Sequence, residues 1–209
     1  MELYFAPLAC SMATRIALAD AGGEATFVQV DTNRGRTIDG TDFRTINPLG
    51  QVPVLRTADG RLLTENTAIL QHVGRAYPDA HLLGREDELP WLQQWLSFVA
   101  TELHKAVFTP LLSPKAPEEA RSLARDKAAA RMGVLDRHLA GREYLLDGFT
   151  VADAYLITVL NWTRAAGVDP APWPAALAYS KRLGTRPSVA RSLEIEGALF
   201  AEAHRKQAA

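Results

Sequence analysis

The chain has 209 residues, of which 47% are hydrophobic and 22% charged, and its 23 basic residues nearly balance 24 acidic ones. This balance argues against a nucleic-acid surface or an acidic tail, and no apolar run approaches the roughly 18–20 residues needed to cross a bilayer. The single cysteine, Cys10, excludes an intrachain disulfide, as is typical of a reducing compartment. The sequence opens in a strand pattern without a signal-peptide pattern, so we expect a cytoplasmic protein.

Strand and helix patterns alternate over the first 78 residues. In chain order we expect strands at 3–5 and 26–31 around a helix at 11–22, a loop at 32–41, a weak helix near 42–46, strands at 51–55 and 61–64 joined by an Asp59-Gly60 turn, and a helix at 65–77. The order βαβ followed by ββα predicts a parallel strand pair with a right-handed crossover and an antiparallel edge.

Only helical patterns follow the proline- and charge-bearing connector. One apolar stripe steps by three and four residues through Leu89, Leu92, Leu96, Val99 and Leu103. Further helices are expected at 118–139, 151–160, 172–184 and 188–202, and the one from Val151 is apolar over most of its circumference, as inside a bundle. We therefore predict an α/β domain at 1–78, a linker at 79–88 and an all-α helical bundle at 89–209.

Cys10 falls at or just before the N-terminus of the first helix. Free backbone N–H groups and the positive end of the helix dipole favour a thiolate there, although a small residue that merely fills the helix start remains an alternative. Because no second cysteine exists, the thiol can form a mixed disulfide only with an external thiol. The adjacent Ser11 is predicted either to donate to a ligand's thiolate or to cap the helix.

Two further segments carry groups suited to a peptide ligand. Val52 and Pro53 stand where a strand begins, and proline there marks an edge or a cis bond, so the Val52 backbone is free to pair with an extended peptide. Glu65 and Asn66 open the next helix, where a carboxylate and an amide suit the charged groups of an amino acid. The alternatives are a simple strand-entry proline and routine helix capping.

The second domain carries a polar stripe and a helix cap. Ser97, Thr101, His104 and Lys105 stand at i, i+4, i+7 and i+8, which suits a helix that lines a cleft, although an exposed polar face is the alternative. Thr150 and Asp153 form a capping box, which we interpret as structural. No His, Cys, Asp or Glu cluster has metal-ligand spacing, so no metal is expected.

Together these motifs resemble a cytosolic glutathione transferase, most closely the bacterial beta class, over nearly the whole chain. The resemblance rests on Ala9-Cys10-Ser11, Asn47-Pro48-x-Gly50-Gln51-Val52-Pro53, Leu63-Thr64-Glu65-Asn66, Ala100-Thr101-Glu102-Leu103-His104-Lys105 and Phe149-Thr150-Val151-Ala152-Asp153-Ala154-Tyr155. It implies a thioredoxin-like first domain with a cis Pro53, a helical second domain and a homodimer. Glutathione is the implied co-substrate, with no other cofactor, and a small hydrophobic electrophile the implied second substrate.

The resemblance also implies roles for single residues. Cys10 would face the glutathione sulfur, Val52 would pair with the cysteinyl backbone, and Glu65 with Asn66 would hold the γ-glutamyl end. From the second domain, His104 would lie nearest the sulfur, and Glu102 would reach the glutathione of this or the partner subunit. The other residues that would approach glutathione from this domain are Ser97, Thr101, Leu103 and Lys105. An apolar pocket for the electrophile is expected from Phe108, Leu111, Leu112 and Trp162.

Two positions depart from the family pattern. Phe5 stands where other classes place a thiol-activating tyrosine, and strand alternation sends the neighbouring Tyr4 to the opposite face. Gly35 replaces a common glutathione-contacting lysine, with Arg34 and Arg36 as the nearest cations.

The sequence predicts a glutathione transferase that activates the thiol with Cys10, Ser11 and His104. Three alternatives stay open: a glutathione-dependent thiol-disulfide reductase that uses a Cys10 mixed disulfide, an isomerase or reductive dehalogenase on the same scaffold, and a non-enzymatic binding protein.

Overall fold

The computed structural model describes residues 1–208 and the side chains through Arg205. The chain forms two compact units, one from Met1–Leu82 with the segment from Pro187 onward, the other Leu83–Arg186. The segment from Pro187 groups with the first unit because helix α8 (Pro187–Ala208) packs against helix α1 (Met12–Asp20). The division into an α/β domain at 1–78, a linker at 79–88 and a helical domain at 89–209 remains a prediction.

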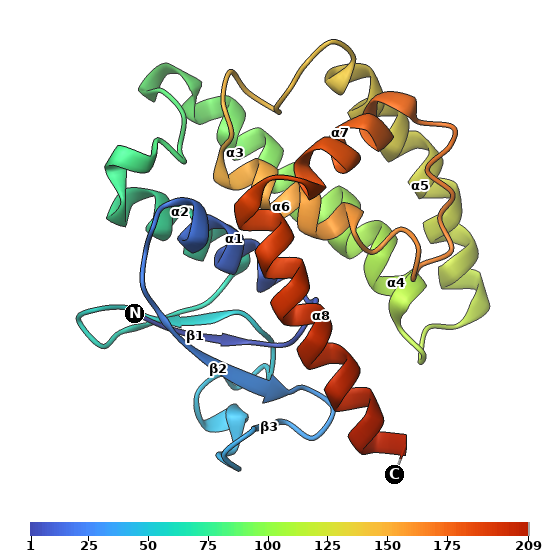
Figure 1. Ribbon diagram of the computed structural model, residues 1–209. Helices are drawn as coiled ribbons and strands as arrows, with labels where there is room; N and C mark the ends of the chain where they lie inside the picture. The colour runs from blue at the N-terminus through green and yellow to red at the C-terminus, as the bar shows by residue number, and fades with distance from the viewer. Residues whose placement is uncertain (209) are drawn as a thin grey trace. The chain divides into compact units, whose positions relative to one another are not determined.

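The first unit is built on a five-stranded sheet (Figure 1). Its strand order is β3-β2-β1-β4-β5, with β1 parallel to β2 and the other pairs antiparallel. The strands are β1 (Glu2–Phe5), β2 (Thr26–Asp31), β3 (Arg36–Thr37), β4 (Val54–Arg56) and β5 (Leu62–Leu63). The predicted βαβ and ββα order is confirmed, but the loop predicted at 32–41 contains β3, a strand too short for a periodic pattern to reveal.

Alternation along β1 supplies both faces of the sheet, as its pattern predicts. Leu3 and Phe5 lie in one apolar cluster with Ile69 of helix α2 (Asn66–Ala76). Tyr4 lies in a second cluster, which includes Phe43 of the 3-10 helix η1 (Phe43–Thr45). Strand β1 is therefore covered on both sides, and its carboxyl end leads directly into the Cys10 loop.

The second unit is helical throughout its regular structure (Figure 1). It contains α3 (Leu89–Phe98), the π-helix η4 (Val99–Phe108), α4 (Thr109–Leu112), α5 (Glu118–Leu139), α6 (Val151–Leu160) and α7 (Pro174–Gly184). The short 3-10 turn η3 (Glu86–Glu88) precedes α3, whereas another such turn, η2 (Pro78–Ala80), belongs to the first unit. Every residue of α6 is buried, which confirms the prediction from its apolar circumference.

The π-helix corrects the sequence-based description of this region. The stripe from Leu89 predicts α spacing as far as Leu103, but the helix widens at Val99 into i→i+5 geometry. Leu92, Val99 and Leu103 are still fully buried. Among short π segments, many mark functional sites, and this one carries five of the residues that the resemblance assigns to the site.

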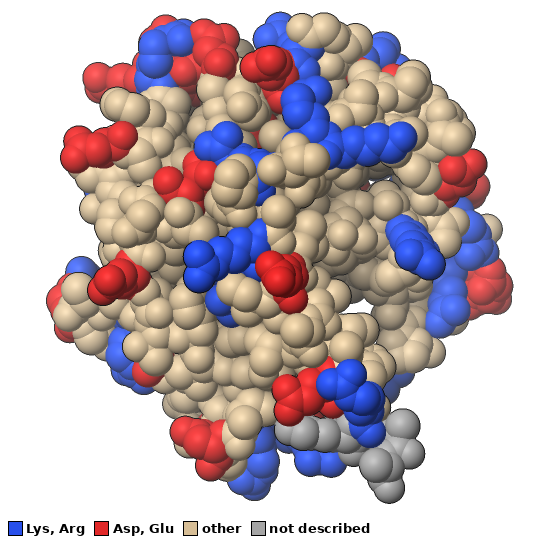
Figure 2. Space-filling model, viewed as in Figure 1, with Lys and Arg blue, Asp and Glu red and all other residues tan. Residues whose placement is uncertain are grey.

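The exposed surface agrees with the balanced composition. Basic and acidic side chains are interspersed on the face that Figure 2 shows. Within residues 1–208, no helix is both long enough and apolar enough to span a membrane.

Candidate functional site

Cys10 lies immediately before Ser11, the N-cap residue of α1. Its side chain is partly buried, and its Sγ donates to the Val52 backbone oxygen at 3.4 Å. The Val52–Pro53 peptide bond is cis, and no hydrogen bond from the Val52 N–H to another described residue is found. The structure thus brings the thiol and an unpaired backbone N–H together, although they are 42 positions apart in sequence.

Ser11 is fully buried and supports the loop that carries Cys10. Its hydroxyl donates to the Ala6 oxygen at 3.2 Å and accepts from the Ala6 N–H at 3.3 Å. It makes no side-chain capping bond to α1, so the predicted N-cap interaction is absent. A role for Ser11 toward a ligand stays a prediction.

Helix α2 begins in an unusual backbone conformation. Its N-cap residue, Glu65, has φ 66°, and the exposed carboxylate makes no capping bond. A non-glycine residue in this region is strained by about 1–3 kcal/mol, and such strain clusters at functional sites. Asn66 does not cap α2, because it is the first residue of the helix itself.

The Asn66 amide is held from α1. Its Oδ1 accepts from Thr14 Oγ1 at 3.4 Å, while its Nδ2 is buried without a described partner. An unsatisfied buried donor costs about 1–3 kcal/mol. The sequence did not single out Thr14, because nothing local links a threonine inside one helix to the start of another.

The Tyr4 hydroxyl is already engaged by Glu2 and Arg56, so it is poorly suited to activate a thiol. Tyr4 donates to Glu2 at 2.6 Å and accepts from Arg56 at 3.1 Å. Burial raises the pKa of Tyr4, and its bond to the Glu2 carboxylate raises that pKa further. Both observations agree with the prediction that Tyr4 is a poor substitute for a tyrosine at Phe5.

Position 35 is shaped for glycine. Gly35 has φ 67°, and a Cβ there would lie 2.9 Å from a guanidinium nitrogen of Arg44. A lysine would be strained in this conformation. The two cations next to Gly35 in sequence are engaged elsewhere, since Arg34 Nε lies 3.6 Å from an Asp31 oxygen and Arg36 donates to Gly40 O at 2.8 Å.

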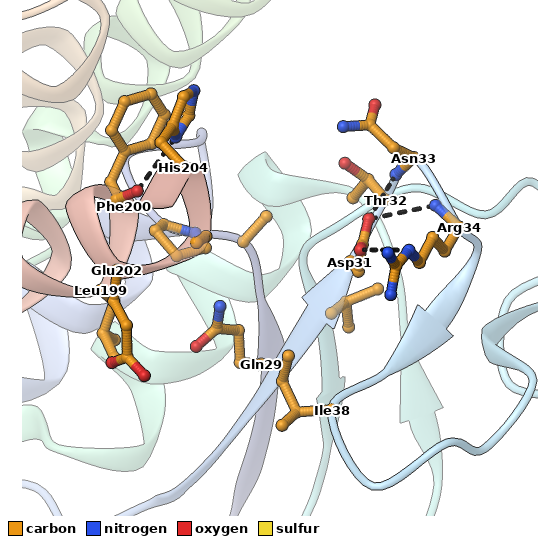
Figure 3. Close-up of a pocket in the computed structure, with 14 residues that line it drawn as sticks. Gln29, Asp31, Thr32, Asn33, Arg34, Ile38, Leu199, Phe200, Glu202 and His204 are labelled. Atoms are coloured by element: carbon orange, nitrogen blue, oxygen red, sulfur yellow. Dashed lines mark hydrogen bonds and ion pairs between the residues drawn. The ribbon is translucent and has the colours of Figure 1, made fainter. Parts of the chain in front are cut away.

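Arg34 instead borders a separate pocket of about 460 Å³ on the first unit (Figure 3). This pocket lies at the carboxyl ends of β1 and β2, with Asp31 on one side and α8 on the other. On the α8 side the His204 and Phe200 rings lie against one another in a tilted arrangement, with centroids 4.0 Å apart. Neither Cys10 nor Val52 lines it, so this cavity is distinct from the group around the thiol.

In the second unit, His104 is paired with Tyr155 of α6. Its Nδ1 lies 2.7 Å from the Tyr155 hydroxyl, and its ring meets Trp162 edge-on, with centroids 5.0 Å apart. Burial lowers the pKa of His104 to about 4, and the positive charge of Lys105 adds to this effect. His104 is therefore neutral near pH 7, where it can make hydrogen bonds but carries no charge. The sequence did not single out Tyr155, whose position follows from how α6 packs on η4.

The other residues predicted in this unit divide into two groups. Ser97, Thr101 and Lys105 are exposed, with the Thr101 hydroxyl donating to Ser97 O at 2.9 Å. Leu103 is fully buried, and the Glu102 carboxylate forms an ion pair with Arg131 at 2.9 Å.

The residues predicted to form the electrophile pocket are only partly grouped. The Phe108 and Trp162 rings lie edge to face, with centroids 6.0 Å apart. Phe108 is fully buried and Leu112 is 39% exposed. In the described part of the chain, no group of three His, Cys, Asp or Glu side chains is arranged to hold a metal.

The capping box that begins α6 is present. The Thr150 N–H and hydroxyl both donate to one Asp153 carboxylate oxygen at 2.9 Å. The other oxygen accepts from Leu145 N and Tyr179 OH. Burial raises the pKa of Asp153 despite these four donors.

Replacing Thr150 with alanine is expected to lower the free energy of unfolding by about 1 kcal/mol, since one buried hydrogen bond at a helix start is lost. Thermal melts measure this, with the exposed Thr185→Ala as a control expected within about 0.5 kcal/mol of wild type. An unchanged melting temperature for Thr150→Ala would contradict the prediction.

Comparison with known proteins finds family matches over most of the chain. The glutathione S-transferase N-terminal domain model matches residues 1–75, and the C-terminal domain model matches residues 118–182. Glutathione S-transferase GstA of Escherichia coli O157:H7 is 38% identical over 200 residues, which cover 94% of this chain and 99% of the relative. This chain belongs to the glutathione S-transferase family.

Solved structures of the family agree over the same extent. The bacterial transferase BphK, solved as a ternary complex, has a TM-score of 0.91 and 41% identity, covering 94% of this chain and 100% of that one. The beta-class transferase of Sphingomonas chungbukensis has a TM-score of 0.89 and 40% identity, covering 94% and 99%. The predicted resemblance and the fold class, a thioredoxin-like α/β domain followed by a helical domain, are confirmed.

Proposed function

We propose that this glutathione S-transferase binds glutathione as co-substrate and activates its thiol for attack on small hydrophobic electrophiles. The observation that carries the proposal is the contact of Cys10 Sγ with Val52 O, beside an unpaired Val52 N–H and the N-terminus of α1. A peptide thiol that pairs with the Val52 backbone brings its sulfur toward the group of donors that favours a thiolate. A sphingomonad family member of 40% identity was solved with glutathione, which supports the same ligand here.

The γ-glutamyl end is assigned to Glu65 and Asn66. The Glu65 carboxylate is exposed, strained at its backbone and unused in capping, so it is available for the ammonium group of the ligand. The N-terminus of α2 favours the neighbouring carboxylate of the same ligand. In the second unit, His104 is proposed to assist at the sulfur, and Ser97, Thr101, Glu102, Leu103 and Lys105 are proposed to assist glutathione binding on the resemblance alone.

Glutathione binding tests this assignment. Glu65→Gln keeps the shape of the side chain but removes its charge, so the dissociation constant for glutathione is expected to rise about tenfold or more, as for a lost hydrogen bond to a charged group. Isothermal titration calorimetry on the full chain measures this. Glu119→Gln, an exposed carboxylate in the first turn of α5, is a matched control that should bind like wild type.

Stability separates binding from folding in this test. The Glu65 side chain makes no capping bond, so the unfolding free energy of Glu65→Gln should stay within about 0.5 kcal/mol of wild type. Wild-type affinity in Glu65→Gln would refute the proposed ammonium site.

A thiol-disulfide reductase is a second candidate, because the Cys10 thiol is partly exposed and lies at a helix start. We further propose a cytoplasmic, homodimeric enzyme of detoxification. The family resemblance supports the dimer, and the single cysteine suits a compartment that keeps glutathione reduced. Light scattering coupled to gel filtration tests the dimer, and a monomer at working concentration would contradict it.

A further inference from the structure

His104 is held on one side by a hydrogen bond with a buried tyrosine. Tyr155 is 2% exposed, and its hydroxyl oxygen lies 2.7 Å from His104 Nδ1. The two rings meet edge to face, with centroids 6.0 Å apart, and Trp162 meets the histidine ring at 5.0 Å. The imidazole therefore has little freedom to rotate, because Tyr155 of α6 and Trp162, two residues beyond the end of α6, both pack against it.

The direction of the Tyr155–His104 hydrogen bond follows from the chemistry of its two partners. The distance of 2.7 Å lies within the range of both O–H and N–H donors, so the relative strengths of the two acceptors decide the direction. A phenol shares its oxygen lone pairs with the ring and accepts weakly, whereas a neutral imidazole nitrogen accepts well. Tyr155 is therefore the donor and Nδ1 the acceptor.

The remaining ring nitrogen then carries the proton. A neutral imidazole has one N–H group, and when Nδ1 accepts, that N–H is Nε2. Nε2 has no partner among the described residues, and it is not a buried atom. The accessible edge of His104 thus presents a hydrogen-bond donor and no free lone pair.

We propose that Tyr155 is a positioning residue that holds His104 in the Nε2–H tautomer, so that His104 acts toward the anionic sulfur of glutathione as a hydrogen-bond donor and not as a general base. This rests on the proposed role of His104 in the transferase reaction. In this arrangement the sulfur's proton leaves to solvent, and His104 stabilises the anion that remains.

The tautomer is measured directly by nitrogen-15 NMR of the full chain with labelled histidine, near pH 7.5 and without glutathione. The chain has five histidines, and loss of one signal set in His104→Gln assigns the residue. The expected wild-type spectrum has a pyrrole-type Nε2 and a pyridine-type Nδ1. In Tyr155→Phe the two nitrogens should move toward each other, as for mixed tautomers. Tyr144→Phe, a partly buried tyrosine of the same unit, should leave them unchanged.

Kinetics then connect the tautomer to the reaction. Tyr155→Phe is expected to lower kcat for conjugation about threefold to tenfold and to leave KM for glutathione within about twofold, because the donor acts on the developing anion more than on binding. A pyrrole-type Nδ1 in wild type, an unchanged spectrum in Tyr155→Phe, or an unchanged kcat would each overturn the proposal. The NMR arm needs no glutathione, so failure of glutathione binding would refute the proposed function and leave the tautomer assignment measured.

Discussion

Replacing Glu196 with alanine is expected to lower the free energy of unfolding by about 3–5 kcal/mol, because it leaves a buried guanidinium without its partner. The Glu196 side chain is fully buried, and its Oε1 lies 2.7 Å from Arg15 Nε. Its Oε2 accepts from the Leu8 N–H at 2.7 Å. Burial raises the pKa of Glu196 even though Arg15 opposes the shift, which reflects the cost of enclosing this charge. Urea denaturation measures the loss.

Two controls make this prediction specific. Glu194→Ala removes an exposed carboxylate from the same helix and is expected to change stability by no more than about 0.5 kcal/mol. Replacing Arg15 by methionine and Glu196 by leucine together should recover most of the loss, because a buried pair of charges contributes little beyond what apolar side chains of similar volume would. A loss below about 1 kcal/mol in Glu196→Ala would show that Arg15 finds solvent or another partner.

The same carboxylate bears on the site. Leu8 has φ 59°, a strained conformation for leucine, and lies two positions before Cys10. Its N–H is held by Glu196 of α8, so the last helix of the chain fixes the loop that presents the thiol. A chain lacking this anchor is expected to lose order in the loop before it loses the sheet.

Replacing Cys10 with serine is expected to abolish glutathione-dependent disulfide reduction, down to the rate without enzyme, because a hydroxyl cannot form a mixed disulfide. Conjugation of an electrophile should persist within about tenfold, since the backbone donors at the start of α1 and the proposed donor on His104 remain. Both rates are measured on one preparation, with a small disulfide and a chromogenic electrophile as substrates.

The two assays on Cys10→Ser, disulfide reduction and conjugation, show whether each reaction requires the Cys10 thiol. If both activities fall to background in Cys10→Ser, the thiol is required for conjugation as well, and the expectation that conjugation proceeds without it is wrong. If disulfide reduction survives, Cys10 is not the nucleophile. Cys10→Ala separates the loss of sulfur from the introduction of a hydroxyl near Val52 O, from which the thiol sulfur lies 3.4 Å.

Local patterns predicted most of the elements but not all of their details. The period of two in β1 placed Tyr4 and Phe5 on opposite faces, and the structure has them in separate apolar clusters. The same type of reasoning missed β3, whose two residues are too few to show a period. It also missed the π-helix, because i→i+4 and i→i+5 hydrogen bonding place nearly the same residues in the core.

The sequence by itself determined the two-part architecture, the thiol at the start of a helix and the capping box of α6, because each depends on neighbours within a few residues. Only the tertiary structure decided which groups those elements bring together. Arg15 and Glu196 are 181 positions apart, and His104 and Tyr155 are 51 apart. Such pairs leave no periodic trace in one sequence, since either partner alone has the pattern of an ordinary helix residue. The position of Cys10 at a helix start could be predicted from the sequence. Its contact with the Val52 oxygen could not, because that contact depends on the tertiary structure.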